Sequence, residues 1–324
     1  MNALDEIPKI NLIPFKTPFY RLNSLSNEFN SNIYIKRDDL TGVGPGGNKV
    51  RSLEYIMGEA LLINNCDLIL ASGPGQSNLC TIAASTCSKL GVDCELIHNC
   101  EKPNDLTGNL LLNKILGVKS HFIGNVSSED RKIFIEELFN EYMKKGYSPY
   151  IIKNGATSGV GCLGYVNCVY EIKSQCENLG INKLTIFAPG GNGGVAAGLI
   201  YGNYLAGFPF NLIIISVEDD ANTLTSHIEK TIKEAECLTG IKMKSNISAS
   251  AKIIDKYMGL GWGCNTADSE KEVFSFAKKE GIFIENIYTS KVVVGMKDML
   301  SKGEVTGDVC FLHTGGFSSL FAQY

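Results

Sequence analysis

The sequence lacks the features typical of membrane-spanning proteins, secreted proteins and metal-binding proteins. It has no apolar run of about 18 residues, which a membrane-spanning helix requires. Its first six residues lack the basic and apolar regions of a secretory signal. The eleven cysteines form no CxxC pair, and the four histidines show no HxxxH or HxH spacing. We therefore expect a cytoplasmic protein with reduced thiols and no metal site.

An excess of positive charge and the common nucleotide motifs are also missing. Lys and Arg number 30 against 34 Asp and Glu, so no nucleic-acid or membrane partner is expected. No GxSxG nucleophile motif occurs. Val50 follows Lys49 where a P-loop needs Ser or Thr. Ala196 and Leu212 stand where a dinucleotide fingerprint needs a glycine and an acidic residue, which disfavours a nucleotide-binding Rossmann enzyme.

The sequence does contain a regular alternation of short apolar runs, glycine-rich turns and helical stretches. Strands are expected at residues 33–37, 67–71, 94–98, 120–124, 150–153, 183–188, 211–217 and 308–313. Residues 8–32 and 241–268 look irregular, with several Pro and Gly breakers. The alternation predicts an α/β fold with mostly parallel sheets.

Four glycine-rich or polar turns (44–49, 72–78, 189–194 and 313–316) follow expected strands, where open α/β sheets bind ligands. Lys49 lies at a loop-to-helix junction. Three interpretations fit this position: a lysine that binds a phosphate, an amine that forms a Schiff base, and a solvated surface lysine. The 189–194 turn fits a phosphate cradle or a tight packing turn. Ser77 and Asn78 begin a helix, either as caps or as part of a carboxylate-binding group.

Six segments occur in the order found in one enzyme family: Ile35–Leu40, Gly47–Tyr55, Gln76–Asn78, Gly191–Leu199, Ile287–Lys291 and Phe311–Gly316. In this combination the chain resembles the D-cysteine desulfhydrase and 1-aminocyclopropane-1-carboxylate (ACC) deaminase family. The resemblance implies the two-domain, tryptophan-synthase-β-like fold of pyridoxal-phosphate (PLP) enzymes, known as fold type II. It also implies a large cofactor domain of residues 1–49 and 161–324, an inserted small domain of residues 50–160, and a homodimer.

The same resemblance implies roles for individual residues. Lys49 matches the Schiff-base lysine, Ser77 a residue at the substrate carboxylate that takes part in proton transfer, and Tyr288 a catalytic tyrosine near the ring. The implied cofactor-binding residues are Lys49, Asn48, Asn78 (near O3′), Gly190, Gly191, Asn192, Gly193, Gly194 and Thr289 (at the pyridine nitrogen). The implied substrate-binding residues are Gln76, Ser77, Asn78, Leu79, Trp262 and Tyr288.

Four positions bear on the reaction. Thr289 stands where the ACC deaminases carry Glu and the desulfhydrases Thr, which favours elimination over ACC ring opening. Val195 replaces a Thr of the phosphate loop, while Leu79 and Trp262 replace a polar residue and a Tyr on the substrate side. We therefore expect a PLP-dependent lyase or deaminase that removes ammonia, with a β-leaving group such as sulfide, from D-cysteine or another small amino acid.

Three alternatives remain open. The chain could be an ACC deaminase, or an L-cysteate sulfo-lyase of the same family. The sulfo-lyase would need a cationic pocket for the sulfonate, and the matched motifs contain no obvious arginine beyond Arg51. A catalytically inactive PLP- or amino-acid-binding homologue is disfavoured by the presence of Lys49, Ser77 and Tyr288.

Overall fold

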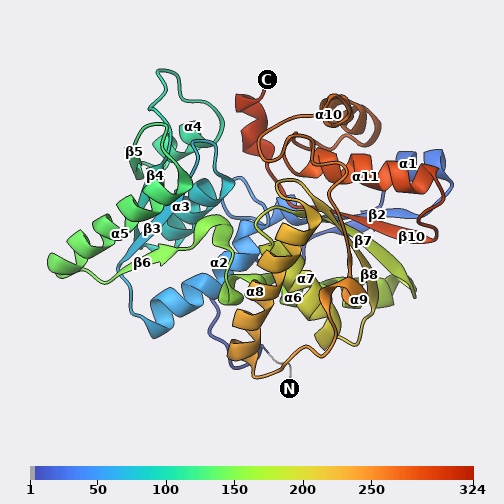
Figure 1. The fold of residues 1–324 in the computed structure, drawn as a ribbon, viewed down its shortest axis with the longest axis horizontal. Helices are drawn as coiled ribbons and strands as arrows, with labels where there is room; N and C mark the ends of the chain where they lie inside the picture. The colour runs from blue at the N-terminus through green and yellow to red at the C-terminus, as the bar shows by residue number, and fades with distance from the viewer. Residues whose placement is uncertain (1–3) are drawn as a thin grey trace.

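The structure is a computed structural model that describes residues 4–324 (Figure 1). Residues 1–3, which open both the segment inspected for a secretory signal and the predicted domain segment 1–49, lie outside the described residues. Strands and helices alternate along most of the chain and form two sheets, as predicted. Among residues 4–324, the one antiparallel pair joins β1 (Phe19–Arg21) to β2 (Ile33–Arg37). No helix in this described part combines the length and the hydropathy needed to cross a membrane.

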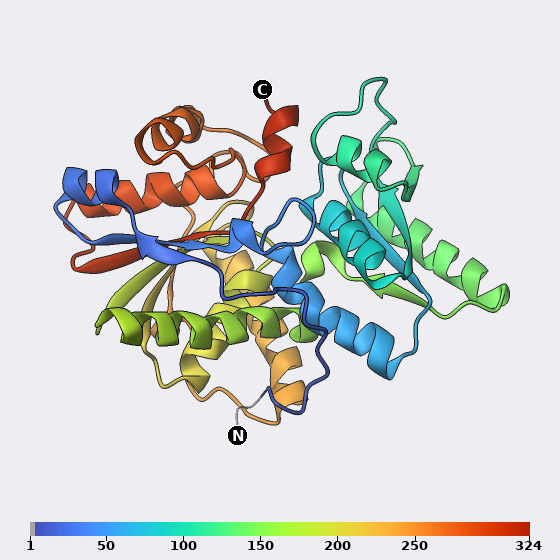
Figure 2. The same ribbon diagram turned by 180° about the vertical axis from the view of Figure 1, so that it is seen from behind.

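The larger sheet has six strands in the order β1-β2-β10-β7-β8-β9. Its other strands are β7 (Leu184–Gly190), β8 (Phe210–Ser216), β9 (Lys252–Ile254) and β10 (Asp308–His313). Its helices are α1 (Asn23–Phe29), α6 (Gly159–Leu179), α7 (Gly194–Leu205), α8 (Ala221–Thr239), α9 (Ile247–Ser250), α10 (Ala267–Glu280) and α11 (Thr289–Ser301). Figures 1 and 2 show α6, α7 and α8 on one side of this sheet and α1 and α11 on the other. Neighbouring Ile186 and Phe187 of β7 accordingly belong to two different hydrophobic clusters, as in a strand covered on both faces.

The smaller sheet has four parallel strands in the order β5-β4-β3-β6. These strands are β3 (Leu68–Gly73), β4 (Asp93–His98), β5 (Lys119–Phe122) and β6 (Pro149–Ile152). Its helices are α2 (Lys49–Met57), α3 (Asn78–Leu90), α4 (Gly108–Ile115) and α5 (Ser128–Lys144). Ile135 and Leu138 of α5 pack on Leu68, Leu70 and Ile97 at one face of the sheet. Shorter helical segments are η1 (Asp38–Leu40), the π-helical η2 (Gly58–Ile63), η3 (Asn154–Ala156) and η4 (Phe317–Ala322).

The structure corrects the expectation that residues 8–32 and 241–268 are irregular. The first range contains β1 and α1, and the second contains α9 and β9. A strand of three residues is too short to show the alternation by which a strand is recognised in a sequence. These two segments are strands because they pair with neighbouring strands: β1 hydrogen-bonds to β2, and β9 hydrogen-bonds to β8.

The smaller sheet lies wholly within residues 68–152, and its helices α3, α4 and α5 stand apart from the larger sheet in both views (Figures 1 and 2). This arrangement supports the predicted division into residues 50–160 and the remainder, which stays a prediction. The hydrophobic core nevertheless continues across the division. One cluster holds Ile69 and Leu96 of the smaller sheet together with Leu184 and Ile186 of the larger sheet. Helix α2 contacts both α3 and α6 and so joins the two parts.

A buried ion network fixes the position of α2. The Arg51 guanidinium donates to Asp38 Oδ2 at 2.7 Å and to Glu171 Oε2 of α6 at 3.1 Å. Lys36 of β2 also pairs with Glu171. Arg51, Asp38 and Lys36 are at most 1% exposed. Burial alone would raise the pKa of Asp38, but Arg51 and Lys36 outweigh it and hold the pKa at about 2. The network therefore ties α2 to β2, η1 and α6.

Asp38→Asn should lower the free energy of unfolding by about 3–5 kcal/mol, because it leaves the buried Arg51 without its main counter-charge. Urea denaturation at pH 7 measures this loss, with the exposed Asp93→Asn as control. The folded pKa of Asp38 is about 2 against an ordinary 3.8. The wild type therefore keeps this stabilisation above pH 3.8 and loses it as the pH falls toward 2, so the two proteins should converge in acid. Similar losses in both variants would contradict the role of the network.

Candidate active site

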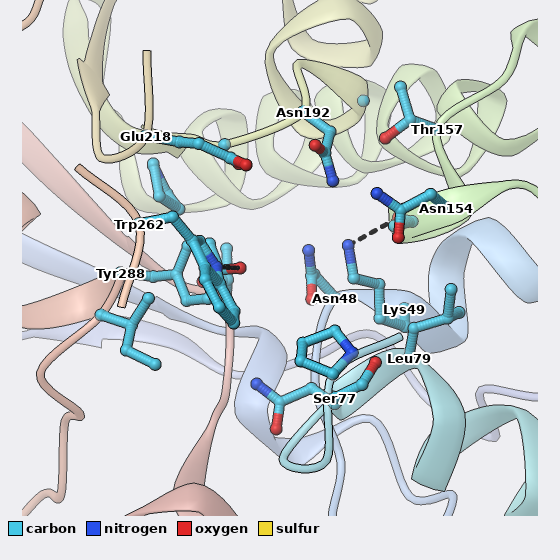
Figure 3. Close-up of a pocket in the computed structure, with 18 of the residues that line it drawn as sticks. Asn48, Lys49, Ser77, Leu79, Asn154, Thr157, Asn192, Glu218, Trp262 and Tyr288 are labelled. Carbon is cyan, nitrogen blue, oxygen red and sulfur yellow. Dashed lines mark hydrogen bonds between the residues drawn. The ribbon is translucent and has the colours of Figure 1, made fainter. Parts of the chain in front are cut away.

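A cavity lies at the carboxyl ends of the parallel strands of both sheets (Figure 3). Loops that follow β3, β4 and β6 line one part of it, and loops that follow β7, β8 and β10 line the other. This is the position at which open α/β sheets bind ligands. Among the described residues, the charged side chains that line the cavity are Lys49, Arg131 and Glu218.

Lys49 reaches the cavity because two glycine-rich turns pack backbone against backbone. Gly47 has a φ of 126°, and a Cβ added there would lie 3.2 Å from the carbonyl oxygen of Thr314. A Cβ on Gly315 would lie 2.7 Å from the Cα of Gly47, which excludes any side chain. The Asn48 N–H donates to the same Thr314 carbonyl at 2.9 Å. These contacts hold the start of α2, whose first residue is Lys49, at the cavity wall.

The amine of Lys49 lies in a partly desolvated environment. Its Nζ donates a hydrogen bond to the Gly155 carbonyl at 2.7 Å, drawn as a dashed line in Figure 3. Burial lowers the pKa of Lys49 to about 8, against the opposing effect of the Glu218 carboxylate. Burial, with help from neighbouring Asp219, raises the pKa of Glu218. A lysine with this pKa presents a larger fraction of neutral, nucleophilic amine at neutral pH than an ordinary lysine.

The start of α7 forms an anion-binding cradle. Gly193 precedes the helix with a φ of 86°, and no side chain caps the first turn. The free backbone N–H groups in the first turn of α7 and the helix dipole favour the binding of a phosphate or carboxylate. A Cβ on Gly194 would lie 3.0 Å from Thr157 Oγ1, so a side chain at that position would crowd the cradle. The Thr157 hydroxyl therefore lies beside the start of α7, where the Val195 side chain has no hydroxyl to offer a phosphate.

Ser77 caps α3 and also lines the cavity. Its Oγ accepts the Cys80 N–H at 3.3 Å, which confirms the capping interpretation and leaves the hydroxyl proton free to be donated. Asn109 orients the two neighbours of Ser77. The Asn109 side-chain NH₂ group donates to Asn78 Oδ1, and the Asn109 backbone N–H donates to Gln76 Oε1, both at 2.8 Å. The NH₂ group of Asn78 has no acceptor among residues 4–324.

Two aromatic residues form the opposite wall. The Trp262 Nε1–H donates to the Tyr288 hydroxyl at 2.6 Å, although Trp262 is otherwise 41% exposed. Burial raises the pKa of Tyr288, so its hydroxyl stays protonated at neutral pH. Figure 3 shows both rings across the cavity from Lys49, where they could contact a planar ligand.

Most of the predicted site residues gather around this cavity. Those that line it are Asn48, Lys49, Gln76, Ser77, Asn78, Leu79, Gly191, Asn192, Gly193, Gly194, Trp262 and Tyr288. Gly190 and Thr289 are not among its lining residues. Gly190 instead packs on Leu224, which would lie 2.5 Å from a Cβ at that position. The Thr289 hydroxyl is buried against Glu285, whose backbone N–H donates to it at 2.8 Å.

Sequence reasoning assigned no role to several other lining residues: Asn99, Arg131, Asn154, Thr157 and Glu218. All except Arg131 lie shortly after a strand, so the rule that ligands bind at strand ends could have found them. Arg131 is the fourth residue of α5 and carries no such signal. Among the described residues, no three His, Cys, Asp or Glu side chains gather as a metal-binding group.

The family model described as "Pyridoxal-phosphate dependent enzyme" matches residues 10–315. The chain belongs to this family of PLP-dependent enzymes. A Pyrococcus horikoshii protein named "Putative 1-aminocyclopropane-1-carboxylate deaminase" is 34% identical over 318 residues, which are 98% of this chain and 94% of the relative. The D-cysteine desulfhydrase of Salmonella newport is 30% identical over 331 residues, covering 100% of this chain and 98% of the relative.

Solved structures agree with this assignment. An "ACC deaminase homologue" superposes with a TM-score of 0.91 and 34% identity, over 99% of this chain and 95% of that one. Threonine deaminase isoform 2 from Solanum lycopersicum has a TM-score of 0.67 over 94% and 81% of the two chains, and at 15% identity it shows the fold alone. These findings confirm the predicted family, the PLP fold type II and the PLP cofactor.

The cavity suits PLP. It presents one primary amine, Lys49, to the aldehyde, and the uncapped start of α7 to the phosphate. Trp262 and Tyr288 offer aromatic surface for the pyridine ring.

Glu218→Gln should shift the pKa of Lys49 below about 8, because it removes the carboxylate that favours the charged amine. The pH dependence of Lys49 acetylation, followed by mass spectrometry of its peptide in the cofactor-free protein, measures this pKa. Half-maximal labelling should move to lower pH. Glu229→Gln removes an exposed carboxylate of α8 and serves as control. An unchanged Lys49 profile in the Glu218 variant would show that the two groups are not coupled.

Proposed function

We propose that this protein is a PLP-dependent lyase or deaminase that eliminates a β-substituent such as sulfide from a small amino acid and releases ammonia. The observation that carries the proposal is the meeting of three groups in one cavity: the Lys49 amine, the uncapped start of α7, and the Ser77–Asn78 pair. Figure 3 shows Lys49 with Asn192 on one side and Ser77 on the other. The 30% identity to a D-cysteine desulfhydrase supports this reaction class.

Lys49 has two roles in this proposal. Its amine would hold the aldehyde of PLP covalently, and in its free form it would accept the Cα proton of the bound substrate. Bound PLP supplies the electron sink that makes this proton acidic. The Cβ–substituent bond then breaks with its electron pair on the leaving group. The released 2-aminoacrylate reacts with water to give pyruvate and ammonia. The lowered pKa of Lys49, about 8, suits an amine that both attacks and accepts a proton near neutral pH.

Ser77 and Asn78 bind and orient the substrate. The hydroxyl of Ser77 and the free NH₂ group of Asn78 are donors suited to the substrate carboxylate, and Asn109 holds the Asn78 amide in the required orientation. The N–H groups at the start of α3 add to this donor set. With the carboxylate fixed here, the Cα–H bond can be presented to Lys49. Tyr288, whose hydroxyl stays protonated, can act as a further proton donor on the opposite side.

The partner of the pyridine nitrogen remains a proposal. The resemblance assigns Thr289 to this role, but its hydroxyl is engaged with Glu285 and lies off the cavity. Thr314 lines the cavity, and its hydroxyl has no hydrogen-bond partner among the described residues. We therefore propose Thr314 as a second candidate. Both candidates are neutral hydroxyls, which suit elimination better than reactions that need a long-lived carbanion.

ACC deamination is the second candidate function. It is favoured by the printed names of relatives at 34% identity, one of them a solved structure. The neutral hydroxyls near the expected ring position argue against it. Assays for keto acid with ACC and with D- and L-amino acids separate the two functions, because ACC yields 2-oxobutanoate and a β-substituted alanine yields pyruvate.

Three further expectations stay proposals. A cytoplasmic location is supported by the scattered, reduced cysteines. A homodimer is proposed by analogy with the family and is tested by light scattering of the purified protein. A discontinuous cofactor domain, residues 1–49 and 161–324, with an insert of residues 50–160 is supported by the two separate sheets.

Lys49→Ala should abolish the absorbance band near roughly 410–420 nm that PLP gives when joined to a lysine. Lys153→Ala removes a lysine that is 61% exposed and should keep the band. The fluorescence of Trp262, the single tryptophan, reports separately whether PLP still enters the cavity of the Lys49 variant. A wild-type protein that stays colourless with added PLP would overturn the proposed function.

Ser77→Ala should lower kcat/KM by about 100-fold or more, because it removes a group that orients the substrate and takes part in proton transfer. It also removes a helix cap, which costs roughly 0.5–2 kcal/mol of stability. Thr266→Ala removes the cap of α10, does not touch the lining of the cavity, and should cost similar stability without loss of activity. Equal activity losses in the two variants would assign the effect of Ser77 to capping alone.

A further inference from the structure

Arg131 places a cation in the wall of the cavity. It comes from the first turns of α5, beside the smaller sheet, and it lines the cavity together with Asn99 and Asn154. The two asparagines follow β4 and β6, so the three side chains meet at the carboxyl edge of that sheet. The sequence motifs point to Arg51 as the arginine for a cationic substrate pocket. Arg51, however, is enclosed in the ion network and is not among the residues that line the cavity.

The hydrogen bonding of Arg131 leaves its charge unbalanced. The residue is 4% exposed, and its Nη1 and Nη2 donate to the amide oxygens of Asn99 and Asn154, the latter at 3.3 Å. Within residues 4–324 no carboxylate lies within ion-pair distance of it. A guanidinium has five N–H donors, so three remain without a protein acceptor in this part of the chain. Arg131 therefore keeps both charge and donors available for a ligand.

Arg51, the other buried arginine among the described residues, shows how the same chain neutralises such a charge. Arg51 is 1% exposed and contacts both Asp38 and Glu171. Burying an ion without a counter-ion costs several kcal/mol, so a protein normally supplies one when the role is structural. Around Arg131 the chain supplies two neutral amides instead. A ligand anion would complete this environment.

A short chain of contacts links Arg131 to the reactive lysine. Its Nη2 donates to Asn154, and the next residue, Gly155, accepts the hydrogen bond from Lys49 Nζ. Figure 3 shows Asn154 beside Lys49 at the cavity wall. Because its oxygen accepts from Arg131, the NH₂ group of Asn154 is a second donor, with no acceptor among the described residues. Both donors thus lie on the side of the cavity formed by the smaller sheet.

We propose that Arg131, assisted by Asn154, binds a tetrahedral oxyanion on Cβ of the substrate, such as a sulfonate, a sulfate ester or a phosphate ester. This inference rests on the proposed function and names its substrate class. The Cα proton passes to Lys49, the bond from Cβ to the oxyanion group breaks, and its electron pair leaves with sulfite, sulfate or phosphate. Pyruvate and ammonia form as for the other β-substituents. Arg131 balances the charge that the leaving group carries away.

Two other roles for Arg131 make different predictions. If it bound the α-carboxylate, or only joined α5 to the loops at Asn99 and Asn154, its removal would weaken every amino acid alike. An oxyanion site instead changes the selectivity between substrates. Glu218, the one carboxylate that lines the cavity in the described structure, lies at the Trp262 and Tyr288 side in Figure 3 and is not paired with Arg131.

The test compares anionic with neutral amino acids. Cysteate, O-phosphoserine and serine O-sulfate are assayed against cysteine and O-acetylserine, as both enantiomers, with wild type and Arg131→Gln. The ratio of kcat/KM for anionic over neutral substrates should fall about 10- to 100-fold, mainly through KM, because a charge-assisted contact is lost. Arg131→Lys keeps the charge and should recover part of the ratio. Lys132→Gln removes a cation that is 60% exposed on the same helix and should leave the ratio unchanged.

A binding readout keeps this test separate from that of the proposed function. Trp262 fluorescence gives Kd for the same amino acids with the PLP-loaded protein, whether or not turnover occurs. If no amino acid is turned over but anionic ones bind in an Arg131-dependent way, the proposed function fails and the oxyanion site stands. If neutral substrates are turned over and Arg131→Gln changes all Kd and kcat/KM values alike, the oxyanion site is overturned and the function stands. The three anions then show which leaving group the site prefers.

Discussion

The structure depends on burying Arg51 with its charge neutralised. Asp38 and Glu171, which lie 13 residues before it and 120 residues after it, must both reach its guanidinium. A buried arginine without them would cost several kcal/mol, so α2 is confined to the position in which both pairs form. Lys49 lies two residues earlier on the same helix, and its place at the cavity follows. The interaction that stabilises the fold therefore also positions the Lys49 amine.

Few charged side chains line the cavity, and the groups that hydrogen-bond to each one suit it to a different role. Lys49 is held by a backbone carbonyl and has its pKa lowered by burial, which suits a nucleophile and base. Arg131 is held by two amides, which orient the guanidinium without neutralising it. The start of α7 adds N–H donors with no side-chain cap. The site as a whole is prepared for anions, as a phosphorylated cofactor and an amino-acid carboxylate require.

Much of this site could be anticipated because its signals are local. Glycines mark the turns at the strand ends, and Gly47 and Gly315 occupy positions that admit no side chain. Ser77 caps a helix, as its residue type suggests. The proposed roles of Gly190 and Thr289 stay predictions, because Gly190 packs on Leu224, Thr289 is buried against Glu285, and neither lines the cavity. Their motif positions indicated the right loops but not which way each residue faces.

The sequence by itself determined the α/β alternation, the parallel sheets, the glycine turns and the family, and it singled out Lys49 as the proposed Schiff-base residue. Each of these depends on short-range patterns or on motifs read in order. Only the tertiary structure decided that β1 and β9 are strands, since three residues become a strand by pairing with a neighbour. It also decided that Arg131 and Glu218 face the cavity. The orientation of a helix side chain depends on how the helix packs on a distant sheet, and that packing is set by many weak contacts spread over the chain.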